Sequence, residues 1–88
     1  MSNCELNQKW MFKIEITKKN SLKELKEIRI WTKTPFGNKP ICVVEEVNKG
    51  FLGATYKKIG EIEDKNDLID FLGMYYGGKI EVRNIQKL

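Results

Sequence analysis

The chain has 88 residues, of which 41% are hydrophobic and 32% are charged, and its formal net charge is +4. This length and composition fit one globular domain with one core, and they argue against an intrinsically disordered chain. The apolar runs fall short of the roughly 18 residues of a membrane span, and no export signal is visible in the polar first residues. We therefore expect a single domain over residues 1–88, located in the cytoplasm, with residues 1–8 as a flexible N-terminal segment.

The first strand is predicted over residues 10–18, because apolar residues recur there at every second position, as in a strand with one buried face. These residues are Trp10, Phe12, Ile14 and Ile16. After a polar interruption, Ser21 and Glu24 have the spacing of a helix capping box. Leu22 and Leu25 then support one helical turn.

Residues 28–34 allow two interpretations. Apolar residues recur here at intervals of three, at Leu22, Leu25, Ile28 and Trp31. Such a spacing drifts around a helix, whereas a buried helical stripe needs intervals of three mixed with four. The alternation of Ile28, Ile30 and Thr32 fits a strand better, and these residue types favour strands. We favour the strand, and one helix over residues 21–32 remains the alternative.

A loop and a hairpin follow. Residues 34–40 hold two prolines around a Gly-Asn pair, which predicts a loop. The apolar run from Ile41 to Val47 predicts a strand, and Asn48-Lys49-Gly50 predicts a tight connection. Residues 51–58 then alternate as a returning strand, so that residues 41–58 form a hairpin.

A helix over about residues 65–76 is predicted next, with Asp64 as its cap and Asp67 in its first turn. Its apolar stripe consists of Leu68, Ile69, Leu72, Tyr75 and Tyr76, with Phe71 at the edge. Gly77-Gly78 ends the helix, and the alternation of Ile80 and Val82 with charged residues predicts a last strand.

These elements predict an α+β fold. We expect a largely antiparallel sheet of four or five strands, with the helix at about 65–76 packed on one face before the final strand. If residues 21–32 were one helix, the order would instead be the ferredoxin-like βαββαβ arrangement.

The two cysteines, Cys4 and Cys42, lie 38 positions apart, and the chain has no histidine. This pattern argues against a structural metal site, and no cofactor is expected. One long-range disulfide remains open, but reduced thiols in a cytoplasm are favoured. Cys42 lies inside an apolar run and is expected to be a small buried hydrophobe.

The positive charge is uneven. Residues 1–44 carry nine basic and four acidic groups, whereas residues 45–88 carry seven and eight. A basic half favours a polyanionic partner. Fourteen of the 16 basic residues are lysine, which lacks the bidentate fork of arginine, so that charge alone is weak support for this partner.

The segment Lys49–Tyr56, Lys-Gly-Phe-Leu-Gly-Ala-Thr-Tyr, resembles the RNP1 segment of RNA-recognition motifs. The resemblance implies that Phe51 stacks on a base between Lys49 and Lys57, while Leu52, Ala54 and Tyr56 enter the core. It covers eight residues, and Gly53 stands where the family has a second stacking aromatic. The first strand also lacks the companion RNP2 pattern, so the chain is not assigned to this family. We favour the other explanation of the segment, which is an ordinary strand after a turn glycine.

Arg29, Trp31 and Lys33 would project from one face if this segment is a strand, and together they could neutralise phosphates and stack a base. We favour the other interpretation, in which Trp31 covers the edge of the core while the cationic stems lie along it.

An enzyme is not expected. Without histidine the usual proton shuttle near neutral pH is absent, and no serine or cysteine has a recognisable activating partner. Asp64, Asp67 and Asp70 lie three apart, but this spacing does not match a calcium loop. Capping and a solvated helix face explain these carboxylates.

The leading hypothesis is a small non-enzymatic module that binds nucleic acid through a basic sheet face carrying aromatic residues. Its candidate residues are Arg29, Trp31, Lys33, Lys49, Phe51 and Lys57. The alternative is a protein-interaction module, either a regulatory or inhibitory accessory protein or a homo-oligomer that uses a free strand edge or the Trp31 surface. No membrane partner is expected.

Overall fold

The computed structural model describes residues 9–34 and 39–87, with the side chains of the last strand described as far as Arg83. The expected flexible segment 1–8, Cys4 and the centre of the 34–40 loop lie outside the described residues. The elements in chain order are β1 (Trp10–Thr17), β2 (Lys23–Lys33), β3 (Ile41–Gly50), β4 (Gly53–Ile62), a 3₁₀ turn η1 (Lys65–Asp67), α1 (Leu68–Tyr76) and β5 (Lys79–Lys87).

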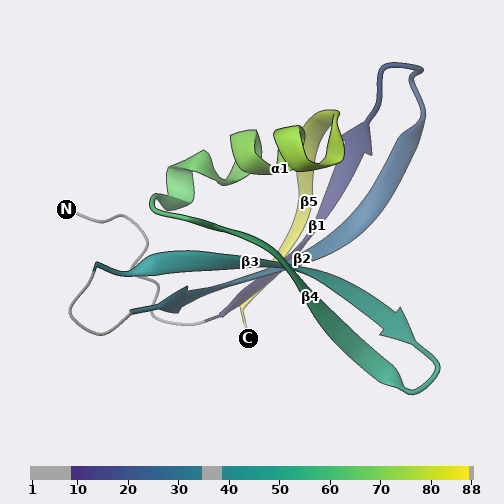
Figure 1. Cartoon of the computed structure of the whole chain (residues 1–88). Helices are drawn as coiled ribbons and strands as arrows, with labels where there is room; N and C mark the ends of the chain where they lie inside the picture. Colours follow the sequence, from purple (N-terminus) through teal and green to yellow (C-terminus); the bar gives the residue numbers. More distant parts are fainter. Residues whose placement is uncertain (1–8, 35–38, 88) are drawn as a thin grey trace.

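The five strands form one antiparallel sheet in the order β4-β3-β2-β1-β5. The first four strands are a meander of hairpins. The chain then crosses one face of the sheet through η1 and α1 and adds β5 beside β1, at the opposite edge from β4 (Figure 1). This confirms the α+β prediction. In the part of the chain that the structure describes, no helix has the length and apolar character needed to cross a membrane.

The predictions for residues 21–25 were wrong, whereas the strand preferred for residues 28–34 is present. β2 is eleven residues long and pairs with all of β1, from Thr17 opposite Lys23 to Trp10 opposite Ile30. Ser21 is not a helix cap but a turn residue with φ 65°. A helical turn here would have left the backbone groups of β1 unpaired, so strand pairing prevails over the local capping signal. The ferredoxin-like alternative is therefore excluded.

The predicted helix is confirmed at both ends. The Asp64 carboxylate accepts a hydrogen bond from the backbone N–H of Asn66 at 2.9 Å, and Gly77 ends α1 with φ 70°. Leu68 and Leu72 are buried against the sheet. Ile69 and Tyr75, which were predicted in the same stripe, are 42% and 43% exposed. The buried stripe is therefore narrower than the sequence suggested.

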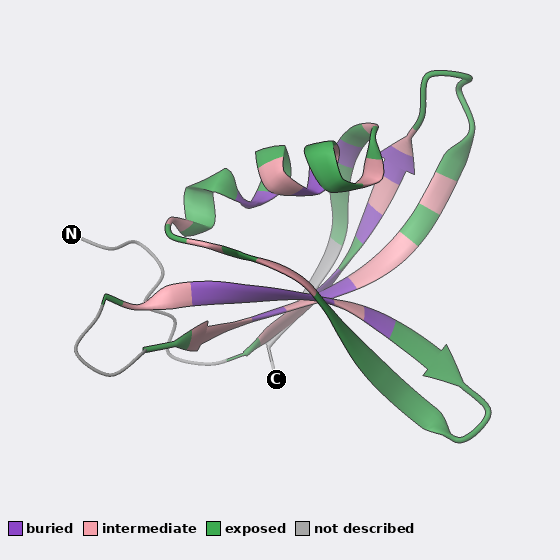
Figure 2. Cartoon of the chain, in the orientation of Figure 1, coloured by how far each residue is buried: buried purple, intermediate pink, exposed green. Residues whose placement is uncertain are grey.

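The core lies between α1 and the helix-covered face of the sheet (Figure 2). Its buried residues are Phe12, Ile14, Ile16, Ile28, Ile30, Val44, Leu68, Leu72 and Ile80. Cys42 is fully buried, as predicted. At Gly60 the ring of Phe71 lies directly on the β4 backbone, because a Cβ added there would be 2.4 Å from Phe71 Cζ.

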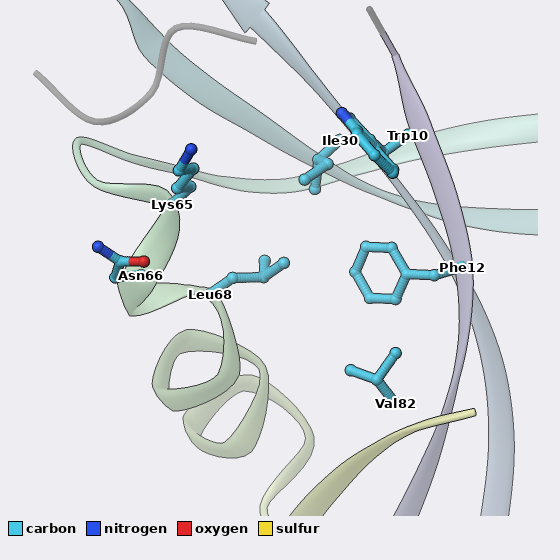
Figure 3. A pocket seen from close by; sticks show the side chains of 7 residues that line it. All are labelled: Trp10, Phe12, Ile30, Lys65, Asn66, Leu68 and Val82. Carbon is cyan, nitrogen blue, oxygen red and sulfur yellow. The ribbon is translucent and has the colours of Figure 1, made fainter. Parts of the chain in front are cut away.

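A hollow of about 350 Å³ opens beside this core, where the start of the helix leaves the sheet (Figure 3). Its walls are mostly apolar, with a lysine and an asparagine from η1 among them; they are Trp10, Phe12, Ile30, Lys65, Asn66, Leu68 and Val82. We refer to this feature as the hollow.

The end of the β3–β4 hairpin extends beyond the helix-covered body as an arm, residues 48–58, in which every residue is exposed (Figure 2). The hairpin was predicted, but its turn is not at Asn48-Lys49-Gly50. Gly50 pairs with Gly53, so the connection is Phe51-Leu52, and Gly53 takes φ 121°. A glycine at this position allows two ordinary residues to make the turn.

Candidate nucleic-acid interface on the open sheet face

The sheet has an open face, which is the face turned away from α1. Strand alternation places nine basic and five acidic described side chains there, a net charge of +4. The basic ones are Lys9, Lys13, Lys23, Arg29, Lys33, Lys49, Lys58, Lys79 and Arg83, and the acidic ones are Glu15, Glu27, Glu45, Glu61 and Glu81. Charge is thus segregated across the sheet.

The opposite, helix-covered side is acidic. Six carboxylates and three lysines lie on α1, on the segment leading into it and on strand positions that face the helix, a net charge of −3 among the described residues. They are Glu24, Glu46, Glu63, Asp64, Asp67 and Asp70, with Lys26, Lys57 and Lys65. A polyanion approaching this molecule would be attracted to the open face and repelled by the other.

At the centre of the open face, Glu45 holds Arg29 and Trp31. Its Oε1 atom accepts from Arg29 Nε at 2.7 Å and from Trp31 Nε1 at 2.8 Å, and Arg29 Nη2 lies 2.7 Å away. The guanidinium carbon of Arg29 lies 3.5 Å from the ring centroid of Tyr56. Trp31, Arg29 and Tyr56 therefore form a fixed plate of flat groups, which we call the Glu45 plate.

The Glu45 plate covers two valine side chains that lie on either side of Glu45 on the open face. Val43 and Val47, which flank Glu45 on β3, are only 2% and 6% exposed, although they point to the open face. Trp31 pairs with Val43 and Tyr56 pairs with Val47 in the register. The Trp31 ring thus has a packing role, and the charge of Arg29 is balanced by Glu45 at 8% exposure.

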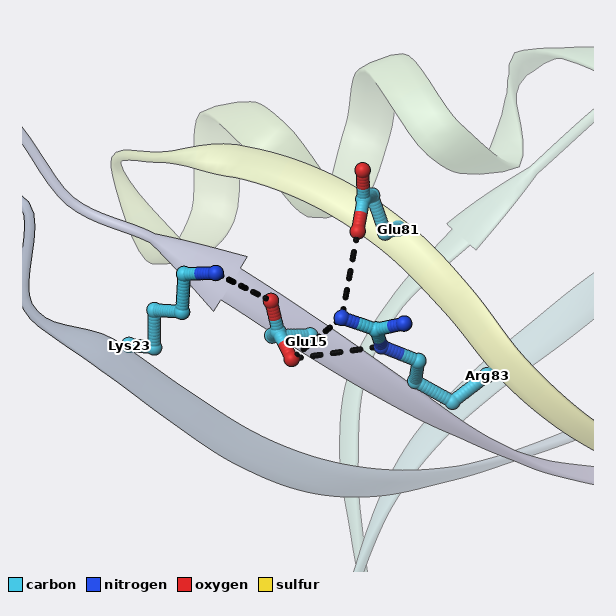
Figure 4. A network of polar contacts seen from close by, with 4 residues as sticks. All are labelled: Glu15, Lys23, Glu81 and Arg83. Carbon is cyan, nitrogen blue, oxygen red and sulfur yellow. Dashed lines mark hydrogen bonds and ion pairs between the residues drawn. The ribbon is translucent and has the colours of Figure 1, made fainter.

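A second polar network crosses the open face from β2 through β1 to β5 (Figure 4). Glu15 accepts from Arg83 Nη2 at 2.7 Å and lies 3.4 Å from Lys23 Nζ, while Arg83 also reaches Glu81 at 3.4 Å. The hydrogen bond from Arg83, with further help from Lys23, holds the pKa of Glu15 below its usual value against the opposing effect of burial. This end of the open face is therefore internally neutralised.

The structure brings four of the six predicted residues to the open face and separates the other two. Arg29, Trp31, Lys33 and Lys49 lie there. Lys33 is 3.7 Å from Glu61, and Lys49 is 3.3 Å from Glu27.

The other two predicted residues lie elsewhere. Lys57 pairs with Glu46 in the register and so faces the helix side. Phe51 is in the turn, eight residues along the chain from the partner of Trp31, which is about 26 Å at the rise of a strand. The two rings cannot stack on one site.

The packing implied by the RNP1 resemblance was wrong. Leu52 is 96% and Tyr56 is 41% exposed, and Ala54 is exposed as well, so none of the three enters the core. Since the turn lies at Phe51-Leu52, this segment forms the tip and one side of an arm that no described helix covers. Phe51 is exposed, but at a hairpin tip and not on a strand face.

Sequence reasoning missed Glu45 and Tyr56. The signal for Glu45 was a carboxylate inside the apolar run from Ile41 to Val47, since a buried carboxylate requires a cationic or N–H partner. Its partner could be identified only once the β2–β3 register was known. Tyr56 was assigned to the core from its alternation.

The described residues contain no group of three or more histidine, cysteine, aspartate or glutamate side chains positioned to hold a metal ion. The Asp64 carboxylate caps η1, and Asp67 and Asp70 are exposed. Comparison with known proteins finds no family model, no curated protein and no solved structure that matches this chain.

Proposed function

We propose that this protein is a small non-enzymatic module that binds nucleic acid on its open face. The observation that carries the proposal is the segregation of charge, with +4 on the open face and −3 on the helix side of one thin sheet. Phosphates attract lysines in any sequence context, and such contacts dominate affinity for nucleic acid.

The Glu45 plate supplies the second requirement, a flat and pre-arranged surface. Arg29 stacks on one side of the Tyr56 ring, and Tyr56 keeps 41% of its surface exposed. A base could stack on this exposed area, and stacking tolerates any base because each has a π face. Lys13 and Lys49 lie on the same face and would contact phosphates on either side.

The first test is fluorescence anisotropy with labelled single-stranded and duplex oligonucleotides of DNA and RNA across a salt series. If the net charge of +4 on the open face neutralises four phosphates, the log–log plot has a slope near −3 to −4, and affinity falls roughly 10²-fold between 50 and 200 mM salt. Wild-type protein that binds none of these oligonucleotides at low salt would remove the proposal.

Matched charge reversals then locate the interface. The double variant Lys13→Glu/Lys49→Glu changes the open face, and Lys57→Glu/Lys65→Glu makes the same change in net charge on the helix side. We expect the first to abolish binding and the second to change affinity a few-fold at most. Equal losses would show that binding follows net charge and not the open face.

A further inference from the structure

The chain has an exposed apolar tip on the arm and an apolar hollow beside the core, and the tip cannot reach the hollow of its own chain. At the arm tip, Phe51 is 103% and Leu52 is 96% exposed, relative to an unfolded reference. The hollow includes Ile30, whose partner in β3 is Val44, and β3 ends six residues beyond Val44 at Gly50, where the tip begins. That is about 20 Å along a two-stranded ribbon that runs away from the hollow.

We propose that two copies of the chain pair reciprocally, with the arm tip of each copy seated in the hollow of the other. A cavity of about 150 Å³ lined by aliphatic and aromatic side chains accepts benzene. The hollow, at about 350 Å³, therefore has room for the ring of Phe51 together with the side chain of Leu52. Both apolar surfaces leave water in the same contact.

The area involved favours a reciprocal pair over a single contact. An aromatic side chain buries about 150–250 Å², so the tip and the wall that it covers would bury roughly 600 Å². Two such contacts give roughly 1,200 Å², which is the lower limit for a stable specific interface. A twofold pair in which each arm is used once is also closed, so it does not grow into chains.

Charge supports the same partner. Residues 48–58 carry three lysines and no carboxylate, whereas residues 63–70, around the entrance to the hollow, carry four carboxylates and one lysine. The arm is thus +3 and the segment that receives it −3. Lys57 is on the helix-facing side of the arm, the side that would meet this acidic segment.

This pairing goes beyond the proposed nucleic-acid binding and does not depend on it. It uses the tip, the hollow and the helix side, and it leaves the Glu45 plate and Lys13 on the open face exposed. A dimer would place two open faces in one particle.

The test is sedimentation velocity over a concentration series, supported by light scattering. Wild-type protein should pass from monomer to dimer and no further. The tip variant Phe51→Ser/Leu52→Ser should stay monomeric, and because both residues are exposed in the turn, circular dichroism should show an unchanged fold. Asn66→Trp, which fills the hollow from its wall, should stay monomeric as well.

Mixing the two variants gives the decisive measurement. The tip variant keeps a hollow and Asn66→Trp keeps a tip, so the mixture should form a 1:1 dimer through one contact, with a dissociation constant well above that of wild type because only half of the contact area is buried. Neither variant should dimerise alone at the same concentrations. A mixture that associates no more than either variant alone, even at the highest concentration reached, would overturn the proposal. So would a tip variant that still dimerises, since that would place the interface elsewhere.

Two further outcomes would assign the tip to another partner and overturn the proposal. In the first, wild type stays monomeric and the tip variant loses oligonucleotide affinity, which gives the tip to nucleic acid. In the second, wild type stays monomeric but binds anionic lipid vesicles through the tip. Failure of oligonucleotide binding alone would leave the pairing intact, because the pairing rests on the tip and the hollow, and neither of these belongs to the open face.

Discussion

Replacing Glu45 by Gln should destabilise the protein strongly, although Glu45 lies on the face of the sheet that no described helix covers. The Gln side chain can still accept from Trp31 Nε1 but removes the negative charge beside Arg29. The two side chains of this ion pair are only 16% and 11% exposed, so Arg29 would be left as a largely buried charge without its counter-ion.

The size of the loss follows from this burial. Exposed ion pairs contribute about 0–1 kcal/mol, and removing one partner of a buried pair costs about 3–5 kcal/mol. With the exposure measured here we expect a loss of about 2–4 kcal/mol. For a domain of this size that lowers the melting temperature by roughly 10–25 °C.

The assay is urea unfolding followed by tryptophan emission, with circular dichroism as a second probe. A double-mutant cycle adds Arg29→Met, which keeps an apolar stem against Tyr56 but carries no charge. Each single variant should lose stability, and the double variant should be more stable than either single variant, because no uncompensated charge remains. Glu61→Gln is the matched control, since Glu61 is 33% exposed and should lose about 1 kcal/mol or less.

Two results would refute this reasoning. Additive losses in the cycle would mean that Arg29 and Glu45 do not stabilise each other. A loss for Glu45→Gln no larger than that for the control would mean that the Glu45 plate is solvated and does not act as a buried layer.

The remaining predictions concern the helix and its contacts with the sheet. Gly60→Ala should lose about 1–3 kcal/mol, because the new Cβ would lie 2.4 Å from Phe71 Cζ, and equal stability in urea would contradict that contact. Asp64→Ala should lose about 1 kcal/mol in thermal melts while Asp64→Asn retains most of it, since either polar side chain can cap the turn. Tyr76→Phe should lose about 1–2 kcal/mol, because the Tyr76 hydroxyl donates to Glu46 at 2.6 Å. Burial, and then Glu46, raise the pKa of Tyr76, so its contribution is complete below the unfolded-state value of about 10 and is lost at higher pH. The variant should therefore lose less stability than wild type between pH 9 and 11, and parallel curves would contradict this assignment.

Much of the fold could be predicted from periodicity, because the correctly predicted segments have one face that enters the core and one that stays in solvent. Residues 10–18 alternate and residues 65–76 follow a helical stripe, and both elements are present. The prediction failed at residues 21–25, where Leu22 and Leu25 are 64% and 67% exposed. Apolar residues that never enter the core give a misleading pattern, and only pairing with β1 determines their conformation.

The turn of the arm was misplaced for a related reason. Turn chemistry favours Asn and Gly, so Asn48-Lys49-Gly50 was a reasonable choice. The actual connection, Phe51-Leu52, is apolar and fully exposed, and no local rule of turn formation selects it. Folding does not require large apolar side chains at these two exposed positions. A contact with another molecule explains them better, and this is the basis for the proposed pairing.

The candidate site was predicted in composition but not in arrangement. Arg29 and Trp31 could be placed on one strand face from their spacing, but their shared partner, Glu45, belongs to the next strand, and the register that joins them is a tertiary property. The Glu45 carboxylate therefore determines which groups on the open face are free and which are fixed. By fixing Arg29 against Tyr56 it removes a mobile cation from the open face and leaves a rigid aromatic surface in its place. If the open face binds nucleic acid as proposed, phosphate contacts must come from the surrounding lysines, and any preference among ligands should arise from stacking and not from arginine forks reading base edges.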